Sequence, residues 1–135
     1  MARTPFSYEL LHPRMRQPTQ LLAIRLEDGY RAGLIPELFR PFEGYRSPQR
    51  QVEMLESKTS KAGPFESAHQ YGLAVDFVPV KNGKENAWHW PEADAPCWDF
   101  LRANAVNRGL LNDISWDRPH IEHPLWRDIR RSVIR

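Results

Sequence analysis

The sequence lacks several features that would assign the protein to a particular class. It contains a single cysteine among 135 residues, so no disulfide can form within the chain, and an oxidising compartment is not needed to explain its folding. It contains no apolar run of membrane-spanning length, and prolines and arginines interrupt residues 1–16, where a secretory signal needs a continuous apolar stretch. We therefore expect a protein made in the cytoplasm, with no signal peptide and no membrane insertion.

An excess of one charge is also missing. The 19 lysines and arginines nearly balance the 17 aspartates and glutamates, which gives a net charge of +2. Only the C-terminus is locally basic, with four arginines around one aspartate: Arg127, Asp128, Arg130, Arg131 and Arg135. A basic helix can bind an anionic polymer such as nucleic acid or cell wall, but a charge run this short is more often a solvated helix face. We favour the solvated face and expect no nucleic-acid partner.

The residues that are present fit one folded domain. The chain is 41% hydrophobic and 27% charged and has five tryptophans, which is the composition of a folded protein and not of a disordered one. No internal repeat or low-complexity segment is visible, and the 12 prolines are scattered instead of forming a linker. We expect a single domain over residues 1–135, and a monomer.

Hydrophobic periodicity and capping residues predict helices mixed with short strands. A helix is expected from Pro18 to about Ala32, where Leu22, Leu26 and Tyr30 recur every four residues. The other predicted elements are a strand at 39–45, a helix at 47–57 begun by Ser47 and Pro48, a buried strand at 73–80, a helix from 94 to 109, a strand and turn at 110–122, and a helix from Pro124. This order indicates an α+β fold with a small, mainly antiparallel sheet packed with helices.

An aspartate in an apolar strand is the first sign of a functional site. Asp76 lies within the predicted strand Leu73–Val80, where a carboxylate is costly to bury unless a cation or hydrogen bonds compensate it. His69 comes seven residues earlier, and the small residues Gly72 and Ala74 between them let the backbone and a ligand approach closely. Asp76 therefore needs a partner, and His69 is a candidate.

A second segment is dense in groups that bind metals and transfer protons. Residues 116–123 contain two carboxylates and two imidazoles, on Asp117, His120, Glu122 and His123. Two histidine nitrogens and one carboxylate oxygen around Zn²⁺, with a fourth position left for water, form the usual open catalytic site, because the ion lowers the pKa of that water to about 7. A nearby carboxylate can then accept its proton. Either segment alone is weak evidence, but together they form a pattern.

These segments resemble the motifs of a known family. Ser67–Asp76 matches every position of the Ser-x-His-x-x-Gly-x-Ala-x-Asp motif of the M15 zinc peptidases, which include D-alanyl-D-alanine carboxypeptidases and L-alanyl-D-glutamate endopeptidases. Asp117–Glu122 resembles the Asp-x-Pro-His-Phe-Glu segment of the endopeptidase branch, which includes phage endolysins, with Ile121 in place of Phe. Gly44–Ser47 looks like the family's arginine-bearing turn, so the resemblance extends over about residues 42–123.

The resemblance implies a fold, a metal and a set of ligands. The fold would be that of the hedgehog and DD-peptidase-like zinc peptidases. His69, Asp76 and His120 would bind Zn²⁺, and Asp117 would act as the general base. Asp117 precedes His120 by three residues, which is near enough for its carboxylate to face the metal site without being a ligand.

The resemblance also implies residues that contact the substrate. Arg46 would bind the substrate carbonyl or the developing oxyanion, because a guanidinium offers several donors to a tetrahedral oxyanion. Ser67 would line the substrate site. Trp88 and Trp90 either form a wall of the substrate groove or pack on the core, and the role of their loop stays open.

Two further roles also stay open. His123 is the main rival to His120 as third ligand, but Pro124 follows it and directs the chain into the final helix. We prefer His120 because it occupies the motif position. Glu122 is either a group that holds a ligand histidine through its second nitrogen or a surface carboxylate.

The implied function is hydrolysis of a peptide bond in the peptidoglycan stem peptide. An endopeptidase that cuts L-alanyl-D-glutamate is favoured because Asp117 and Pro119 match that branch, whereas the dipeptidase branch typically has Glu at the base position. The alternatives are a D-alanyl-D-alanine carboxypeptidase and a non-catalytic zinc module that binds wall peptides or a protein partner. The lack of an export signal and of a separate wall-binding domain suggests an enzyme that acts on the cell wall after release in phage lysis, or a virion-associated protein.

Overall fold

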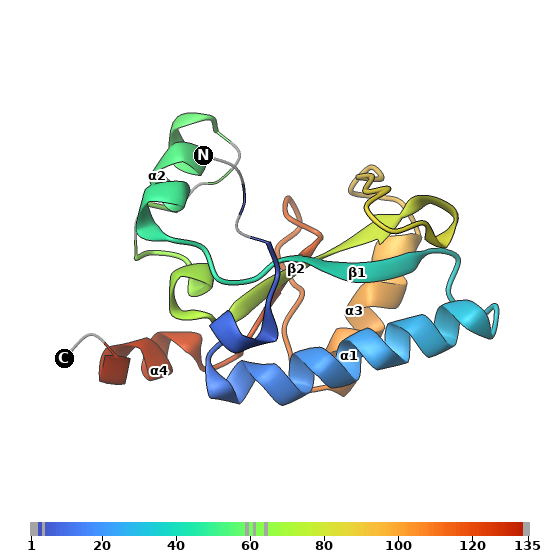
Figure 1. Ribbon diagram of the computed structural model, residues 1–135, viewed down its shortest axis with the longest axis horizontal. Helices are drawn as coiled ribbons and strands as arrows, with labels where there is room; N and C mark the ends of the chain where they lie inside the picture. The colour runs from blue at the N-terminus through green and yellow to red at the C-terminus, as the bar shows by residue number, and fades with distance from the viewer. Residues whose placement is uncertain (1–2, 4, 59, 61, 64, 134–135) are drawn as a thin grey trace.

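The computed structural model describes residues 3, 5–58, 60, 62–63 and 65–133 (Figure 1). Its α-helices are α1 (Pro13–Arg31), α2 (Pro48–Glu56), α3 (Cys97–Asn107) and α4 (Trp126–Val133). Its strands are β1 (Leu38–Glu43), β2 (Ala74–Val80) and β3 (His120–Glu122). Short 3-10 helices lie at η1 (Tyr8–Leu10), η2 (Ala68–Tyr71) and η3 (Lys81–Gly83).

The strands form one antiparallel sheet in the order β1-β2-β3, so β2 has a neighbour on each side. On β2, Asp76 lies opposite His120 of β3 and opposite Glu43 of β1. The pairing of β1 shifts between Pro41 and Glu43, and without this irregularity Phe42 would stand opposite Asp76. A small antiparallel sheet packed with helices confirms the predicted α+β fold.

The core lies between the sheet and the apolar sides of the helices. α1 runs along the sheet in Figure 1, and its buried stripe faces β1 and α3. The core residues of α1, β2 and α3 that are at most 1% exposed include Met15, Leu22, Leu26, Val75, Phe77, Trp98 and Leu101. Within β2 only Asp76 is partly exposed. Among the described residues, no helix is both long enough and apolar enough to cross a membrane.

The first helix begins earlier than the sequence predicts. α1 starts at Pro13, so the expected start at Pro18 was wrong and Pro18 lies inside the helix. The imidazole of His12 caps the helix by accepting a hydrogen bond from a backbone N–H of the first turn. Met15 and Thr19 are fully buried, which extends the buried stripe toward the N-terminus. The predicted N-cap at Ser47 and the predicted buried strand that ends at Val80 are confirmed.

The predicted strand and turn at 110–122 is mostly turn. Only His120–Glu122 joins the sheet, and Leu111 pairs with Glu122 as an isolated bridge. The side-chain amide of Asn112 donates to the carbonyls of Arg118 and His120 at 2.6 and 2.9 Å. These bonds close residues 113–119 into a loop at the sheet edge, and this loop carries Asp117.

Candidate active site

Three side chains that are distant in the sequence converge beside the sheet. His69 comes from η2, Asp76 from β2 and His120 from β3, and one possible ligand atom of each lies within 4.8 Å of the others. His69 Nε2 is 3.2 Å, and His120 Nδ1 3.7 Å, from the same oxygen, Asp76 Oδ1. The two histidines are 1% and 6% exposed. The structure thus brings together the three residues that the sequence predicts as metal ligands.

The local sequence explains how His69 reaches this position. Ser67 begins η2, and its Oγ accepts a hydrogen bond from the backbone N–H of His69 at 3.3 Å, while Gln70 closes the capping box. The helix ends at Gly72, which has a left-handed φ of 68°. A Cβ at this position would lie 2.6 Å from the backbone nitrogen of His12, so glycine is required. The chain can therefore turn from His69 directly into β2.

A second hydrogen bond orients each imidazole. His69 Nδ1 lies 2.7 Å from the carbonyl oxygen of Gly44, which can only accept, so Nδ1 donates to it and Nε2 is the ring nitrogen that faces Asp76. His120 Nε2 lies 2.8 Å from Glu122 Oε1, and the indole of Trp126 donates to Glu122 Oε2 at 2.8 Å. His120 therefore presents Nδ1 to the site. Of the two roles considered for Glu122, the structure favours holding His120.

The donor set fits Zn²⁺. Asp76 Oδ1 is buried and accepts no hydrogen bond, although it faces the ring nitrogens of His69 and His120. A buried carboxylate oxygen in such a position is costly unless a cation binds it. Two imidazole nitrogens and one carboxylate oxygen are a common zinc ligand set with a position left open.

The electrostatics of the site favour a bound cation. Burial raises the pKa of Asp76, but the neighbouring imidazoles and the Arg46 guanidinium outweigh burial and hold it well below its usual value. Burial lowers the pKa of His120, but the neighbouring carboxylates of Asp76, Glu122 and Asp117 outweigh burial and raise the pKa to about 10. Without a metal, the site therefore keeps a proton on His120 against the Asp76 carboxylate. A metal ion would take the place of that proton.

Asp117 lies at the edge of this group. Its Oδ2 is 3.9 Å from His120 Nδ1, and its side chain is 38% exposed. Burial raises the pKa of Asp117, and so does the charge of Asp76, against the opposing effect of the nearby cations. A carboxylate with a raised pKa, beside a metal site but outside its ligand set, is suited to accept a proton.

Arg46 is buried and faces protein groups. The residue is 4% exposed, and its guanidinium donates to Gln51 Oε1 at 2.9 Å, Glu43 Oε1 at 3.0 Å and Asp76 Oδ2 at 3.3 Å. These bonds hold one oxygen of Asp76 and leave the other directed at the metal site. Glu43 and Gln51 were not predicted from the sequence, although Glu43 carries the same signal as Asp76, an acidic residue in a predicted strand. A contact of Arg46 with the substrate stays a prediction.

His123 points away from the metal site. Its Nδ1 accepts a hydrogen bond from the backbone N–H of Leu125 at 3.0 Å, and its own backbone N–H donates to Leu73 at 2.9 Å. The imidazole therefore stabilises the turn that leads into α4. This geometry supports the choice of His120 over His123.

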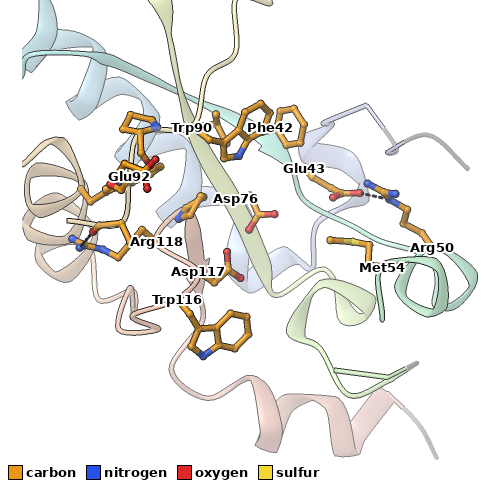
Figure 2. A pocket seen from close by; sticks show the side chains of 15 residues that line it. Phe42, Glu43, Arg50, Met54, Asp76, Trp90, Glu92, Trp116, Asp117 and Arg118 are labelled. Atoms are coloured by element: carbon orange, nitrogen blue, oxygen red, sulfur yellow. Dashed lines mark hydrogen bonds and ion pairs between the residues drawn. The ribbon is translucent and has the colours of Figure 1, made fainter. Parts of the chain in front are cut away.

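A cleft of about 510 Å³ opens beside Asp76 and Asp117 (Figure 2). Its walls are aromatic, with Phe42 and Trp90 on one side of the two carboxylates and Trp116 on the other. Trp90 and Trp116 are 57% and 53% exposed. A ligand in the cleft would therefore contact indole rings while it faces the metal site.

Two residues that the sequence suggested for the substrate site do not line this cleft. Trp88 and Ser67 are not among the described residues that line the cleft. The Trp88 ring packs edge-on against Phe42, with a centroid distance of 5.0 Å. The Trp90 ring packs edge-on against Phe42 as well, at 5.3 Å, but Trp90 lines the cleft and Trp88 does not. Substrate contact by Ser67 stays a prediction, and in the structure its Oγ caps η2.

Comparisons with known proteins agree on the architecture. No protein-family model and no curated protein sequence matches the chain. Among solved structures, the L-Ala D-Glu endopeptidase ChiX of Serratia marcescens matches over 90% of this chain and 86% of its own, with 26% identity and a TM-score of 0.56. The LD-carboxypeptidase LdcB matches over 88% of this chain, with 21% identity and a TM-score of 0.57. This chain spans 64% of the LdcB chain.

The chain has the M15-type peptidase fold. A third M15-type structure, the vancomycin-resistance D,D-pentapeptidase VanY in complex with Zn(II), matches over 93% of this chain and 79% of its own, with 16% identity and a TM-score of 0.56. The resemblance seen in the sequence motifs is thus confirmed by the fold. Zinc in an M15-type structure also agrees with the fit of His69, Asp76 and His120 to that metal.

Proposed function

We propose that the protein is a zinc peptidase that hydrolyses a peptide bond in the peptidoglycan stem, at L-alanyl-D-glutamate. The observation that carries this proposal is the position of the Asp117 carboxylate, which lies between the buried His69–Asp76–His120 group and an open cleft. ChiX, an L-Ala D-Glu endopeptidase, shares the fold and 26% of the aligned residues. The motif Asp117–Glu122, which resembles the endopeptidase branch, supports the same bond.

In the proposed reaction the chain's own residues bind, orient and transfer a proton. Zinc held by the three ligands would activate water and polarise the scissile carbonyl. Asp117, with its raised pKa, accepts a proton from the attacking water as the new C–O bond forms. When the C–N bond breaks, Asp117 returns this proton to the leaving amine.

Groups behind the ligands keep this geometry in place. Gly44 and Glu122 hold the two imidazoles, and Arg46 holds Asp76 Oδ2. Because these contacts are made before the substrate arrives, little reorganisation is needed during the reaction. We also propose that Arg46 contributes to binding of the substrate carbonyl oxygen.

The shape of the cleft supports an endopeptidase. The cleft continues on both sides of Asp76 and Asp117, toward Arg50 at one end and toward Arg118 at the other (Figure 2). An endopeptidase needs this space because its substrate extends beyond both residues of the scissile bond. A D-alanyl-D-alanine carboxypeptidase is the second candidate, because another solved neighbour is VanY in complex with D-alanine-D-alanine.

Mass spectrometry of muropeptides tests the proposal. Purified stem-peptide muropeptides are digested with zinc-loaded protein, and a chelator-treated sample serves as the control. We expect a free N-terminal D-glutamate and a fragment that ends in L-alanine, both absent after chelation. Release of a single D-alanine would instead identify a carboxypeptidase, and binding of the peptides without any cleavage would identify a non-catalytic module.

We also propose that the protein reaches the cell wall in phage lysis or as part of a virion. The support is the resemblance of Asp117–Glu122 to the branch that includes endolysins. Expression in a bacterial host tests the lysis role, with and without a protein that permeabilises the inner membrane. We expect lysis only with the permeabilising protein, and lysis without it would contradict this route.

A further inference from the structure

One end of the cleft contains a buried carboxylate that the proposed mechanism does not use. Glu43 is 1% exposed, and each of its oxygens accepts a hydrogen bond from an arginine. Arg46 Nη2 donates to Oε1 at 3.0 Å, and Arg50 Nε donates to Oε2 at 3.4 Å. A buried carboxylate needs such partners to offset its lost hydration. The register shift places Glu43 opposite Asp76, and its partner Arg50 lines this end of the cleft.

The two arginines differ in their surroundings. The charge of Arg46 is shared between two carboxylates, because its guanidinium also donates to Asp76. The Arg50 side chain is 22% exposed and lines the cleft. Arg46 and Arg50 together balance the charges of Glu43 and Asp76. Of the two guanidinium groups, that of Arg50 is the one that lines the cleft.

The position of Arg50 is set at both ends of the residue. Its backbone N–H donates to Ser47 Oγ at 3.1 Å, which is the N-cap of α2, and its Nε contacts Glu43. An arginine held in this way loses less conformational freedom when it binds an anion. Met54, one helical turn later on α2, lines the same end of the cleft (Figure 2). An apolar side chain therefore lies beside the positive charge.

The arginine at the other end of the cleft is engaged differently. Arg118 Nη2 donates to Asp99 Oδ1 at 3.0 Å, and Glu92 lines the cleft at the same end (Figure 2). The charge of Arg118 thus has two carboxylates in its neighbourhood. An anionic group of a ligand is favoured at the Arg50 end.

We propose that Arg50 binds a carboxylate of the substrate and that Glu43 is the positioning residue that holds Arg50 for this contact. This inference rests on the proposed function, in which the substrate is a peptidoglycan stem peptide. A stem peptide with lysine at its third position offers two carboxylates of the same chemistry, the α-carboxylate of D-glutamate and the terminal carboxylate of D-alanine. A guanidinium prefers either one to the corresponding carboxamide, because it forms charge-assisted paired hydrogen bonds with a carboxylate.

The experiment compares stem peptides that differ in one carboxyl group. One pair carries a carboxylate or a carboxamide at the α-position of D-glutamate, and the other pair has a free or an amidated D-alanine terminus. Calorimetry on zinc-loaded Asp117→Asn protein measures affinity without turnover. We expect one pair to show about 10- to 100-fold tighter binding of the carboxylate form. Adding Arg50→Gln should reduce that preference to about 2-fold or less.

The peptide pair that shows the carboxylate preference identifies which substrate carboxylate binds at Arg50. Arg31→Gln is the matched control, because Arg31 pairs with Glu27 on the exposed side of α1, and it should keep the full preference. Glu43→Gln should lose part of the preference while circular dichroism shows a folded protein, and an unchanged preference would remove the positioning role.

The failure of this inference differs from the failure of the proposed function. If Arg50→Gln keeps the carboxylate preference in both pairs, or if no pair shows a preference, Arg50 is not the carboxylate site. If the Asp117→Asn protein shows the expected preference but the wild-type protein cleaves no stem peptide, the proposed hydrolysis is wrong while the binding site stands. A protein that binds none of the four peptides overturns both.

Discussion

The metal-binding side of the site and the walls of the cleft are built in opposite ways. His69 and His120 are 1% and 6% exposed, and an additional hydrogen bond fixes each ring. Trp90 and Trp116 lie outside the helices and strands and are 57% and 53% exposed. One side is a closed network, whereas the other is open surface carried by loops.

This difference separates the groups that would perform the chemistry from those that would recognise the substrate. Metal ligands must be held within small tolerances, which buried and doubly bonded side chains achieve. A cleft that receives a peptide attached to a polymer needs accessible surface, which loops on a rigid scaffold supply. We therefore expect large losses from changes on the metal side and small ones from changes in the walls.

Removal of a ligand should have the largest effect. His69→Ala or His120→Ala should abolish stoichiometric zinc binding and reduce muropeptide cleavage to background, because two of three ligands do not hold the ion. Metal analysis of the purified variants measures the zinc content. His123→Ala is the matched control and should retain both zinc and activity. Full zinc occupancy in His120→Ala with loss in His123→Ala would show that the third ligand was misassigned.

Asp117→Asn should separate catalysis from metal binding. The amide keeps the shape of the side chain but cannot accept a proton, so we expect zinc to stay bound while kcat falls by about 10² to 10⁴-fold. Single-turnover cleavage of a defined muropeptide gives the rate. Near-normal turnover in this variant would remove Asp117 from the role of base.

Arg46→Lys tests whether Arg46 acts on the substrate or only on the protein. Lysine keeps the positive charge, but its single ammonium nitrogen cannot replace the two guanidinium nitrogens that donate to Glu43, Gln51 and Asp76. We expect a fall of about 10² in kcat/KM, the usual size for one lost oxyanion donor, and a lowered melting temperature. If the melting temperature falls while kcat/KM of the zinc-loaded protein is unchanged, the role of Arg46 is structural.

Glu122→Gln should weaken the metal site by a smaller factor. The amide has one acceptor oxygen and cannot accept from both His120 and Trp126, as the carboxylate does. Loss of such a partner typically reduces metal affinity by about 10- to 100-fold, which competition with a chelator measures. Asp128→Asn, an exposed carboxylate on α4, is the control and should bind zinc as the wild type does.

Changes in the cleft walls should have the smallest effects. Trp90→Ala and Trp116→Ala should each raise KM by about 5-fold, equivalent to about 1 kcal/mol, and alter the free energy of unfolding by less than about 0.5 kcal/mol. Both Trp88 and Trp90 pack on Phe42, but Trp88 is half-buried and does not line the cleft, so Trp88→Ala should show the reverse. Steady-state kinetics and urea unfolding distinguish the two patterns. A loss of zinc from either wall variant would contradict the separation between the two sides of the site.

Local patterns in the sequence predicted much of the fold and the three residues that converge at the candidate metal site. The Ser47 cap and the apolar strand that ends at Val80 depend on neighbouring residues, and both are confirmed. The start of α1 was placed wrongly at Pro18, because the cap is an imidazole, His12, and because the burial of Met15 depends on the rest of the core. Propensity alone does not contain such contacts.

The chemistry-bearing residues were readable because each is anomalous within its own segment. Asp76 is an acidic residue in an apolar strand, and His69 and His120 stand at motif spacing from other polar groups. By contrast, only the tertiary structure decided which residues contact Arg46. It also decided that Trp90 lines the cleft and that Trp88 does not. Strand register and loop packing depend on contacts between residues far apart in the chain. The register shift in β1 is the clearest case, since one irregularity exchanges Phe42 for Glu43 opposite Asp76 and places a buried carboxylate beside the metal site.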